Sequence, residues 1–244
     1  MLTDFTAFLK LRRRELDAWL SQRGIGHTFS LASYGLYRSA AQLVTEHARG
    51  VVLDAGSGHA PYRQMLRERG QQVISIDIED RSGDVTHIAD IQNMPVIATG
   101  SIDTVICTEV LEHVPAPWDA LKELERVLKP GGTLILTVPY LAPIHEAPND
   151  FFRYTRYALE LLLTRAGFQL EQLEEVGGAF AFLGHGASMA FFGSCGALPG
   201  LRELAWGINY ALLVRGLGLV DSAIGLKHVY PCNYVLLARK PGAS

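Results

Sequence analysis

The sequence predicts an α/β fold built on a doubly wound, mainly parallel sheet. Residues 51–176 alternate short β-rich runs with helical runs, a pattern that places right-handed crossovers between parallel strands. Glycines follow the helical runs, as expected where helices end. The chain has 244 residues, of which 48% are hydrophobic and 19% charged, so it is long enough for one large α/β domain and is not disordered.

The expected elements follow from apolar periodicity. Strands are predicted at Val51–Gly56, Gln72–Ile78, Val85–Asp90, Ile102–Val110, Thr133–Pro139, Gln169–Val176 and Asn233–Lys240. Helices are predicted at Ser33–Ala48, Pro61–Arg69, Pro117–Lys129 and Thr155–Ala166. Residues 1–50 as a whole are expected to be a helical segment that precedes a domain of residues 51–244.

Composition narrows the classes of function. The net charge of −3 offers no basic surface for nucleic acid. Three cysteines, Cys107, Cys195 and Cys232, lie far apart without zinc-ligand spacing, so neither a disulfide framework nor a metal site is expected, and a reducing compartment is the default. The N-terminal segment lacks the pattern of a secretory signal, and the expected location is cytoplasmic.

An apolar run ends in two closely spaced glycines. Gly56 and Gly58 would let the backbone approach a ligand, and the following helix offers free N–H groups. Pro61 stands where a dinucleotide fingerprint requires a third glycine, which disfavours an NAD-dependent reductase. Asp77 ends the second strand and could accept both hydroxyls of a ribose, although a solvated strand end is the simpler alternative.

Five motifs in order resemble class I S-adenosylmethionine (SAM) methyltransferases of the type 11 branch. They are Leu53–Gly58, Ile76–Ile78, Ala89–Ile91, Ile102–Val114 and Leu128–Leu134. The resemblance implies a Rossmann-like, seven-stranded, mostly parallel sheet whose last strand, Asn233–Lys240, lies antiparallel beside the fifth.

The same resemblance implies SAM as cofactor and assigns residues to it. Asp54 would lie near the methionine ammonium, with Gly56 and Gly58 along the methionine and ribose. Asp77 with Ile78 would hold the ribose, and Asp90 with Ile91 the adenine. Thr108 and Glu109 would lie under the sulfonium. The chain lacks an Asp-Pro-Pro-Tyr-type motif after the fourth strand, which argues against methylation of nucleic-acid bases.

Candidate catalytic residues follow the fourth and fifth strands, where the methyl group would lie. His145 could act as general base because its ordinary pKa lies near neutral pH, with Asp150 orienting it. His113 is a second base candidate, and its alternative is a packed helix-start residue.

Three further residues of the 138–155 loop are predicted to bind substrate. Tyr140, Arg153 and Tyr154 combine aromatic and cationic groups near the expected methyl site. The alternative is a structural loop in which Asp150 pairs with Arg153 and Thr155 caps the next helix.

Residues 177–230 form an insertion that is longer than an ordinary turn between strands. No Asp, Glu, Lys or Arg occurs between Glu175 and Arg202, while phenylalanine, leucine and glycine are frequent. The insertion is expected to form apolar helices that act as a lid or a homodimer surface, or meet a membrane or a lipid-linked substrate. A transmembrane helix is the weakest interpretation because glycines, serines and His185 interrupt the run. An N-terminal helix with Phe5, Phe8 and Leu9 and the basic residues Lys10, Arg12, Arg13 and Arg14 could add an amphipathic surface at the inner face of the membrane, and a solvated helix packed on the sheet is the simpler alternative.

These observations predict SAM-dependent methyl transfer to an oxygen, in preference to nitrogen or carbon, of a small-molecule or glycan-like acceptor. The rival hypothesis is a Rossmann-like scaffold that binds SAM without turning it over. The glycine turn and its acidic residues argue only for binding, so the two hypotheses differ in what the 145–154 loop contributes.

Overall fold

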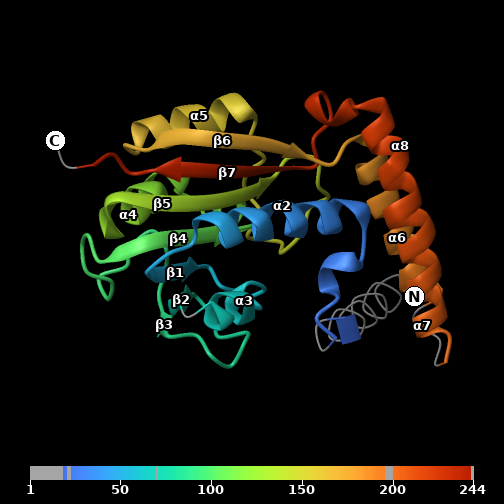
Figure 1. The fold of residues 1–244 in the computed structure, drawn as a ribbon, viewed down its shortest axis with the longest axis horizontal. Coiled ribbons are helices and arrows are strands. Elements are labelled where there is room, and N and C mark those ends of the chain that lie inside the picture. The colour runs from blue at the N-terminus through green and yellow to red at the C-terminus, as the bar shows by residue number, and fades with distance from the viewer. Residues whose placement is uncertain (1–18, 21–22, 70, 196–199, 243–244) are drawn as a thin grey trace. The chain divides into compact units, whose positions relative to one another are not determined.

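The computed structural model describes residues 19–20, 23–69, 71–195 and 200–242, and these form two compact units (Figure 1). The sheet unit comprises Ser39–Glu174 and the residues from Asn233 onward. The helical unit comprises Glu175–Cys232 and the described residues before Ser39. The predicted amphipathic helix of Phe5, Phe8 and Leu9 lies outside the described residues, and the predicted division into residues 1–50 and 51–244 stays a prediction.

A seven-stranded sheet forms the centre of the sheet unit. Its strands are β1 (Val51–Ala55), β2 (Gln72–Asp77), β3 (His87–Ile88), β4 (Ile102–Thr108), β5 (Leu128–Pro139), β6 (Gln169–Val176) and β7 (Asn233–Arg239). They lie in the order β3-β2-β1-β4-β5-β7-β6. β1 pairs in parallel with β2 and β4, whereas β7 pairs antiparallel with β5, where Val138 lies opposite Tyr234. The predicted seven-stranded sheet with an antiparallel last strand is confirmed.

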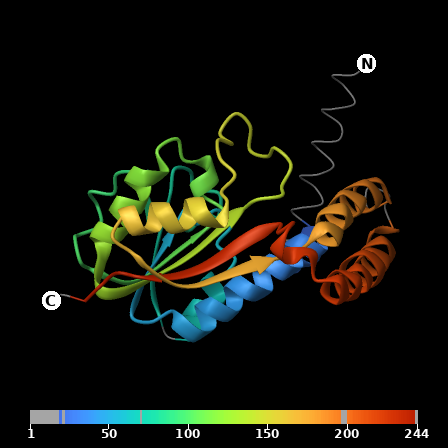
Figure 2. The same ribbon diagram turned by 90° about the horizontal axis from the view of Figure 1, so that it is seen from above.

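Helices cover both faces of this sheet (Figure 2). α4 (Pro117–Val127) and α5 (Arg156–Arg165) cover one face, and α3 (Arg63–Glu68) with the C-terminal part of α2 (Leu31–His47) covers the other. α4 buries Leu121 and Leu124 at helical spacing against the strands, where they join the main apolar core. Because strand side chains alternate between faces, both layers are needed to bury the apolar residues of the central strands.

Two strands differ from their predicted bounds for identifiable reasons. β3 is only two residues long, and just before it the Ser75 N–H donates to the Thr86 hydroxyl at 3.1 Å instead of to a backbone carbonyl. β5 begins at Leu128, five residues before the predicted start, since Leu128 already pairs with Ile102 and Gly131 makes the following irregularity with a φ of +78°.

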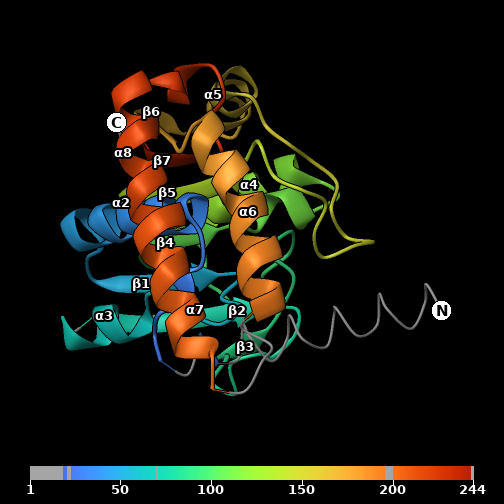
Figure 3. The same ribbon diagram turned by 90° about the vertical axis from the view of Figure 1, so that its right-hand side faces the viewer.

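The helical unit confirms that the insertion forms helices (Figure 3). They are α6 (Ala179–Cys195), α7 (Arg202–Ile208), the π-helical η3 (Asn209–Gly216) and α8 (Leu217–Ile224), with short 3-10 turns η1 (Gly26–Thr28) and η4 (Leu226–His228). α6 and α8 lie side by side, and Asp221 of α8 accepts the Phe180 N–H at the start of α6. The Trp206 indole donates to the Thr28 hydroxyl at 2.9 Å, so the insertion packs on the residues before β1.

Large apolar side chains of the helical unit are exposed. Leu219 is 75% exposed, and Leu183, Leu204 and Leu212 are each more than 60% exposed. Across the described part of the chain, the helices are too short or too polar to span a bilayer.

Candidate functional site

The turn after β1 requires glycine for steric reasons. Gly56 has a φ of +75° and Gly58 a φ of +49°, a region that side chains other than glycine rarely occupy. A Cβ on Gly56 would lie 2.5 Å from a methyl carbon of Val110, so a larger residue would displace the chain that follows β4. The N–H groups of Gly56 and Ser57 donate to the Ile76 carbonyl at 2.9 and 3.0 Å, which ties the turn to β2.

Two aspartates flank this turn in different environments. Asp77 is 9% exposed at the end of β2, and its carboxylate accepts N–H bonds from Gly58 at 2.8 Å and from Glu79 at 3.1 Å. Asp54 is 3% exposed in β1, and its Oδ2 atom has no hydrogen-bond partner among the residues that the structure describes. Burial raises the pKa of Asp54 to about 7.

A cavity of about 340 Å³ opens beside the turn at the carboxyl end of the parallel strands. Its lining includes eight of the residues predicted for the site: Gly56, Gly58, Asp77, Ile78, Asp90, Ile91, Glu109 and His113. Asp54 and Thr108 do not line it, and Asp90 is exposed with its carboxylate bonded to Gln92. β1, β2, β4 and the segments after them therefore bring together most of the predicted cofactor residues.

Glu109 follows β4 and adopts an unusual backbone conformation. Its φ of +55° lies in the left-handed region, which a residue with a side chain seldom occupies without a constraint. Here the constraint is Thr137 of β5, whose hydroxyl donates to Glu109 Oε1 at 2.9 Å. Burial, together with the nearby Glu112, raises the pKa of Glu109. The carboxyl group therefore sits at the cavity wall with an increased tendency to hold a proton.

The loop after β5 is held by an ion pair. Arg153 donates to both oxygens of Asp150 at 2.6 and 2.9 Å, and the backbone N–H of His145 donates to Asp150 at 2.9 Å. The Arg153 guanidinium lowers the pKa of Asp150 well below its usual range. This is the structural arrangement weighed as the alternative for Asp150 and Arg153, and Thr155 also caps α5 by accepting the Ala158 N–H at 3.2 Å.

The two tyrosines predicted to bind substrate occupy different places. Tyr154 is 4% exposed and donates its hydroxyl to the Leu111 carbonyl at 2.9 Å, so the structure places it in the core rather than on an acceptor surface. The predicted substrate role of Tyr154 is corrected accordingly, because the hydroxyl is already satisfied and the ring is covered. Tyr140 is half-buried and packs its ring on Tyr234, with 5.9 Å between ring centroids.

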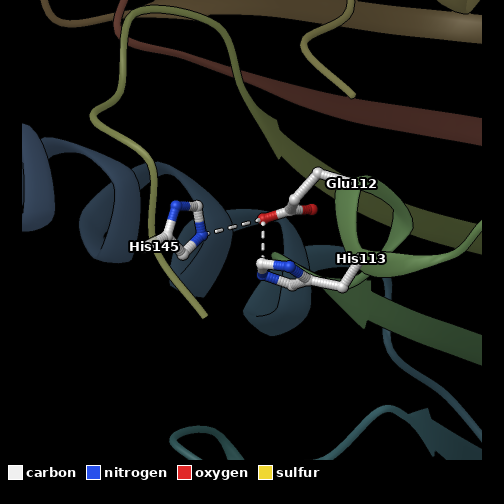
Figure 4. Close-up of side chains that lie close together, drawn as sticks. All are labelled: Glu112, His113 and His145. Atoms are coloured by element: carbon white, nitrogen blue, oxygen red, sulfur yellow. Dashed lines mark ion pairs between the residues drawn. The ribbon is translucent and has the colours of Figure 1, made fainter. Parts of the chain in front are cut away.

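Both candidate histidines meet at a glutamate that the sequence reasoning missed (Figure 4). Glu112 and His113 belong to the short 3-10 turn η2 (Leu111–His113), and His145 comes from the loop after β5. Glu112 Oε1 lies 3.5 Å from Nε2 of His113 and 3.6 Å from Nε2 of His145. Glu112 is fully buried, and within the described part of the chain neither of its carboxylate oxygens has a hydrogen-bond partner. Interaction with Glu112 raises the pKa of His145.

Backbone bonds hold the two segments of this cluster together. The carbonyl of Glu112 accepts the N–H groups of Phe151 and Phe152 at 2.9 and 3.2 Å. His113 lines the cavity, whereas His145 is 37% exposed beside it and is absent from the lining. No signal in the sequence separated Glu112 from the other acidic residues, since only the fold brings it within reach of His145.

Comparison with known proteins identifies this part of the chain. Residues 53–136, from β1 to β5, match the family described as a methyltransferase domain. This segment of the chain is therefore similar to that methyltransferase family. The match confirms the resemblance to the type 11 branch and covers the glycine turn, Asp77 and the Glu112–His113 pair.

Curated relatives match over part of their length. A ubiquinone biosynthesis O-methyltransferase of Xanthomonas oryzae is 32% identical over 113 residues, which cover 41% of this chain and 45% of that protein. The ubiquinone biosynthesis O-methyltransferase of Xanthomonas campestris is 30% identical over 162 residues, covering 61% of this chain and 64% of that protein. The chain thus spans about half to two thirds of the length of these methyltransferases.

Among solved structures, the fold resembles a methyltransferase of Burkholderia thailandensis. That protein, 1,6-didemethyltoxoflavin-N1-methyltransferase, was solved with bound 1,6-didemethyltoxoflavin and S-adenosylhomocysteine. The likeness has a TM-score of 0.56 at 17% identity and covers 97% of this chain and 86% of that chain. At this identity it shows a shared fold.

Proposed function

We propose that this chain transfers the methyl group of SAM to an oxygen of a small-molecule or glycan-like acceptor. One observation carries the proposal: in a chain whose residues 53–136 match a methyltransferase family, most of the residues that the motifs assign to SAM line a single cavity at the carboxyl end of the strands. Asp77, Asp90 and Glu109 come from three separate motifs, and their convergence supports one cofactor site.

The residues fit SAM chemically. A Cβ on Gly58 would meet no atom within 4 Å, so the turn borders open space there, and Asp77 offers a carboxylate to ribose hydroxyls. The buried, unpartnered oxygen of Asp54 is suited to attract the methionine ammonium electrostatically, either by direct contact or through the turn beside it. When bound, SAM supplies an electrophilic methyl group, so the protein's contribution is to orient the acceptor, exclude water and manage the acceptor's proton.

Oxygen is the favoured methyl acceptor because of the proton-accepting groups at and beside the cavity wall. Proton-accepting atoms that could take a proton from a hydroxyl are present in Glu112, His113 and His145. Of these residues, His113 lines the cavity itself. Two relatives are named O-methyltransferases, which supports this preference. Asp150 and Arg153 act by positioning His145, through the bond from the His145 N–H to Asp150.

The experiment compares binding with turnover. Calorimetry should detect SAM and S-adenosylhomocysteine binding at one site and little heat with NAD. Incubation of methyl-labelled SAM with a panel of phenolic, catecholic and sugar hydroxyl compounds should then release S-adenosylhomocysteine together with a labelled methyl ether. Tight SAM binding without label transfer to hydroxyl, amine or carbon acceptors would favour the SAM-binding scaffold instead.

The role of the helical unit belongs to the same proposal. Its exposed leucines support a lid, a homodimer surface or a peripheral contact with membrane at the cytoplasmic side. Light scattering of the full chain and co-sedimentation with anionic liposomes distinguish these roles. A dimer without lipid binding supports the homodimer surface, and lipid binding by a monomer supports the membrane contact. A monomer that does not bind lipid favours the lid.

A further inference from the structure

Three side chains at or beside the cavity wall, of which His113 lines the cavity, direct metal-ligand atoms toward one another (Figure 4). One carboxylate oxygen of Glu112 and the Nε2 atoms of His113 and His145 lie within 4.8 Å of one another. Two histidines and one carboxylate are a ligand set used by divalent transition metals. The sequence predicts no metal here because the two histidines are 32 residues apart and become neighbours only through the fold.

Hydrogen bonding determines which nitrogen of His113 carries the proton. Its Nδ1 atom lies 2.6 Å from the backbone carbonyl of Asn149, and a carbonyl only accepts. Nδ1 must therefore donate, which leaves a lone pair on Nε2 of the neutral ring. That lone pair faces Oε1 of Glu112 at 3.5 Å. Two hydrogen-bond acceptor atoms therefore lie next to each other, which is unfavourable unless a positive charge lies between them.

The distances favour a metal ion over a shared proton. Direct N–H···O bonds to a carboxylate span about 2.7–2.9 Å, which is shorter than the 3.5 and 3.6 Å that separate Glu112 Oε1 from the two Nε2 atoms. Two ligands that are each about 2.1 Å from a tetrahedral Zn²⁺ ion lie about 3.4 Å apart. These two separations therefore match the edges of a coordination polyhedron more closely than they match hydrogen bonds.

Outer contacts hold the histidines as metal ligands are usually held. Metal-bound histidines donate their second ring nitrogen to a carbonyl or a carboxylate. His113 does so to Asn149, and Nδ1 of His145 lies 3.2 Å from the Pro143 carbonyl and 3.6 Å from Asp150, both of which can accept its proton. The buried carboxylate of Glu112 otherwise lacks any partner that would offset its desolvation.

We propose that Glu112, His113 and His145 bind a divalent transition-metal ion, with Zn²⁺ as the best geometric match, and that this ion binds the hydroxyl oxygen of the acceptor. The proposal rests on methyl transfer to oxygen as the function. The ion favours the deprotonated hydroxyl, whose proton passes to solvent. The acceptor oxygen then forms a bond to the methyl carbon while the methyl–sulfur bond breaks and its electron pair goes to sulfur. His145 serves in this scheme as a ligand rather than as the free general base.

Metal binding is tested without any acceptor. The untagged full chain is stripped with a chelator and titrated with Co²⁺ and then with Zn²⁺. We expect one Co²⁺ ion per chain, the visible absorption bands of tetrahedral cobalt, and their loss when Zn²⁺ displaces it. His113→Ala, His145→Ala and Glu112→Gln should each weaken binding by at least about tenfold to a hundredfold, given that loss of outer contacts alone has effects of that size. His47→Ala, whose ring lies on α2 outside the cluster, is the matched control.

The outcomes separate the metal proposal from the proposed function. Failure of the wild type to bind one Co²⁺ ion, or equal binding by the three cluster variants, overturns the metal site. In that case chelator-resistant methyl transfer would leave the methyltransferase function standing, with the cluster acting through protons. One bound ion that the variants lose, in a chain that does not bind SAM, would instead retain the metal site and reject the methyltransferase function.

Discussion

The proposed cofactor end and acceptor end of the site differ in the groups that form them, which are mainly backbone at the first and ionisable side chains at the second. At the cofactor end, the backbone of Gly56 and Gly58 shapes the wall, and Asp77 is already held by two N–H groups. At the proposed acceptor end, His113 lines the wall, and the buried carboxylate of Glu112 next to it has no hydrogen-bond partner among the described residues. The cofactor end is thus shaped mainly by backbone, with Asp54 buried beside it, whereas the acceptor end depends on a buried carboxylate that lies between two histidines.

This difference indicates a division of labour. A preformed wall of backbone and a fixed carboxylate binds a constant ligand with little rearrangement. Buried groups with unmet charge are costly for folding and are retained where they bind or activate something. Substitutions at the cofactor end should therefore change affinity for SAM, while substitutions at the acceptor end should change the rate of transfer.

The largest expected effect is that of Glu112→Gln on turnover. With an acceptor that the wild type methylates, we expect the rate constant for transfer to fall about 10²–10⁴-fold, because activation of the hydroxyl is lost. Stopped-flow or quench measurement at saturating SAM gives this rate. Glu123→Gln removes an acidic partner of Arg126 on α4 and serves as control. A Glu112→Gln rate within twofold of the wild type would remove the cluster from the reaction.

Asp77→Ala should have the next largest effect, on binding of SAM. Loss of a charge-assisted contact to the ribose should weaken affinity by about 1–3 kcal/mol, measured by calorimetry. Glu79→Gln, two residues further on and exposed, removes one negative charge without opening the turn. Equal affinities for the two variants would contradict the assignment of Asp77.

The pH dependence of SAM binding sharpens the role of Asp54. Burial raises the pKa of its carboxyl to about 7, so the free protein holds a proton there at pH 6. An ammonium group brought nearby favours the ionised form, so binding below pH 7 must release that proton. We therefore expect the affinity for SAM to rise by up to about tenfold per pH unit below pH 7 and to level off above it.

Asp54→Asn is the matched variant for this pH dependence. It retains the shape of the side chain but cannot ionise, so its affinity for SAM should be flat in the same range. Calorimetry in two buffers of different ionisation enthalpy would count the protons released. If the affinity of the wild type for SAM depended on pH as little as that of Asp54→Asn, the proposed interaction of Asp54 with the methionine ammonium would be contradicted.

The smallest predicted effect concerns Tyr154. Tyr154→Phe removes the hydroxyl that donates to the Leu111 carbonyl and leaves the ring in the core, so it should lower the free energy of unfolding by about 1 kcal/mol. Urea denaturation measures this change, with the exposed Tyr157→Phe as control. A structural role predicts an unchanged Michaelis constant for the acceptor, whereas an increase of tenfold or more would restore Tyr154 to the acceptor pocket.

The sequence predicts the cofactor end better than the acceptor end, and the reason is physical. The glycine turn and Asp77 lie within one β–α–β unit, where local spacing determines which residues meet. Glu112 and His145 are far apart in sequence and meet because the loop after β5 bonds its backbone to η2. β3 and β5 differ from their predicted bounds for a related reason. The Thr86 hydroxyl bonds to the Ser75 N–H next to β3, and Leu128 pairs with Ile102 at the start of β5.

Calorimetric titration of SAM into Asp77→Ala and Glu112→Gln tests the division of labour most directly. It needs no acceptor, and both substitutions remove one negative charge from the same end of the sheet. Our account predicts that Asp77→Ala binds SAM about 1–3 kcal/mol more weakly than the wild type, whereas Glu112→Gln binds it with unchanged affinity. Equal weakening in both variants, or weakening in Glu112→Gln alone, would contradict the account.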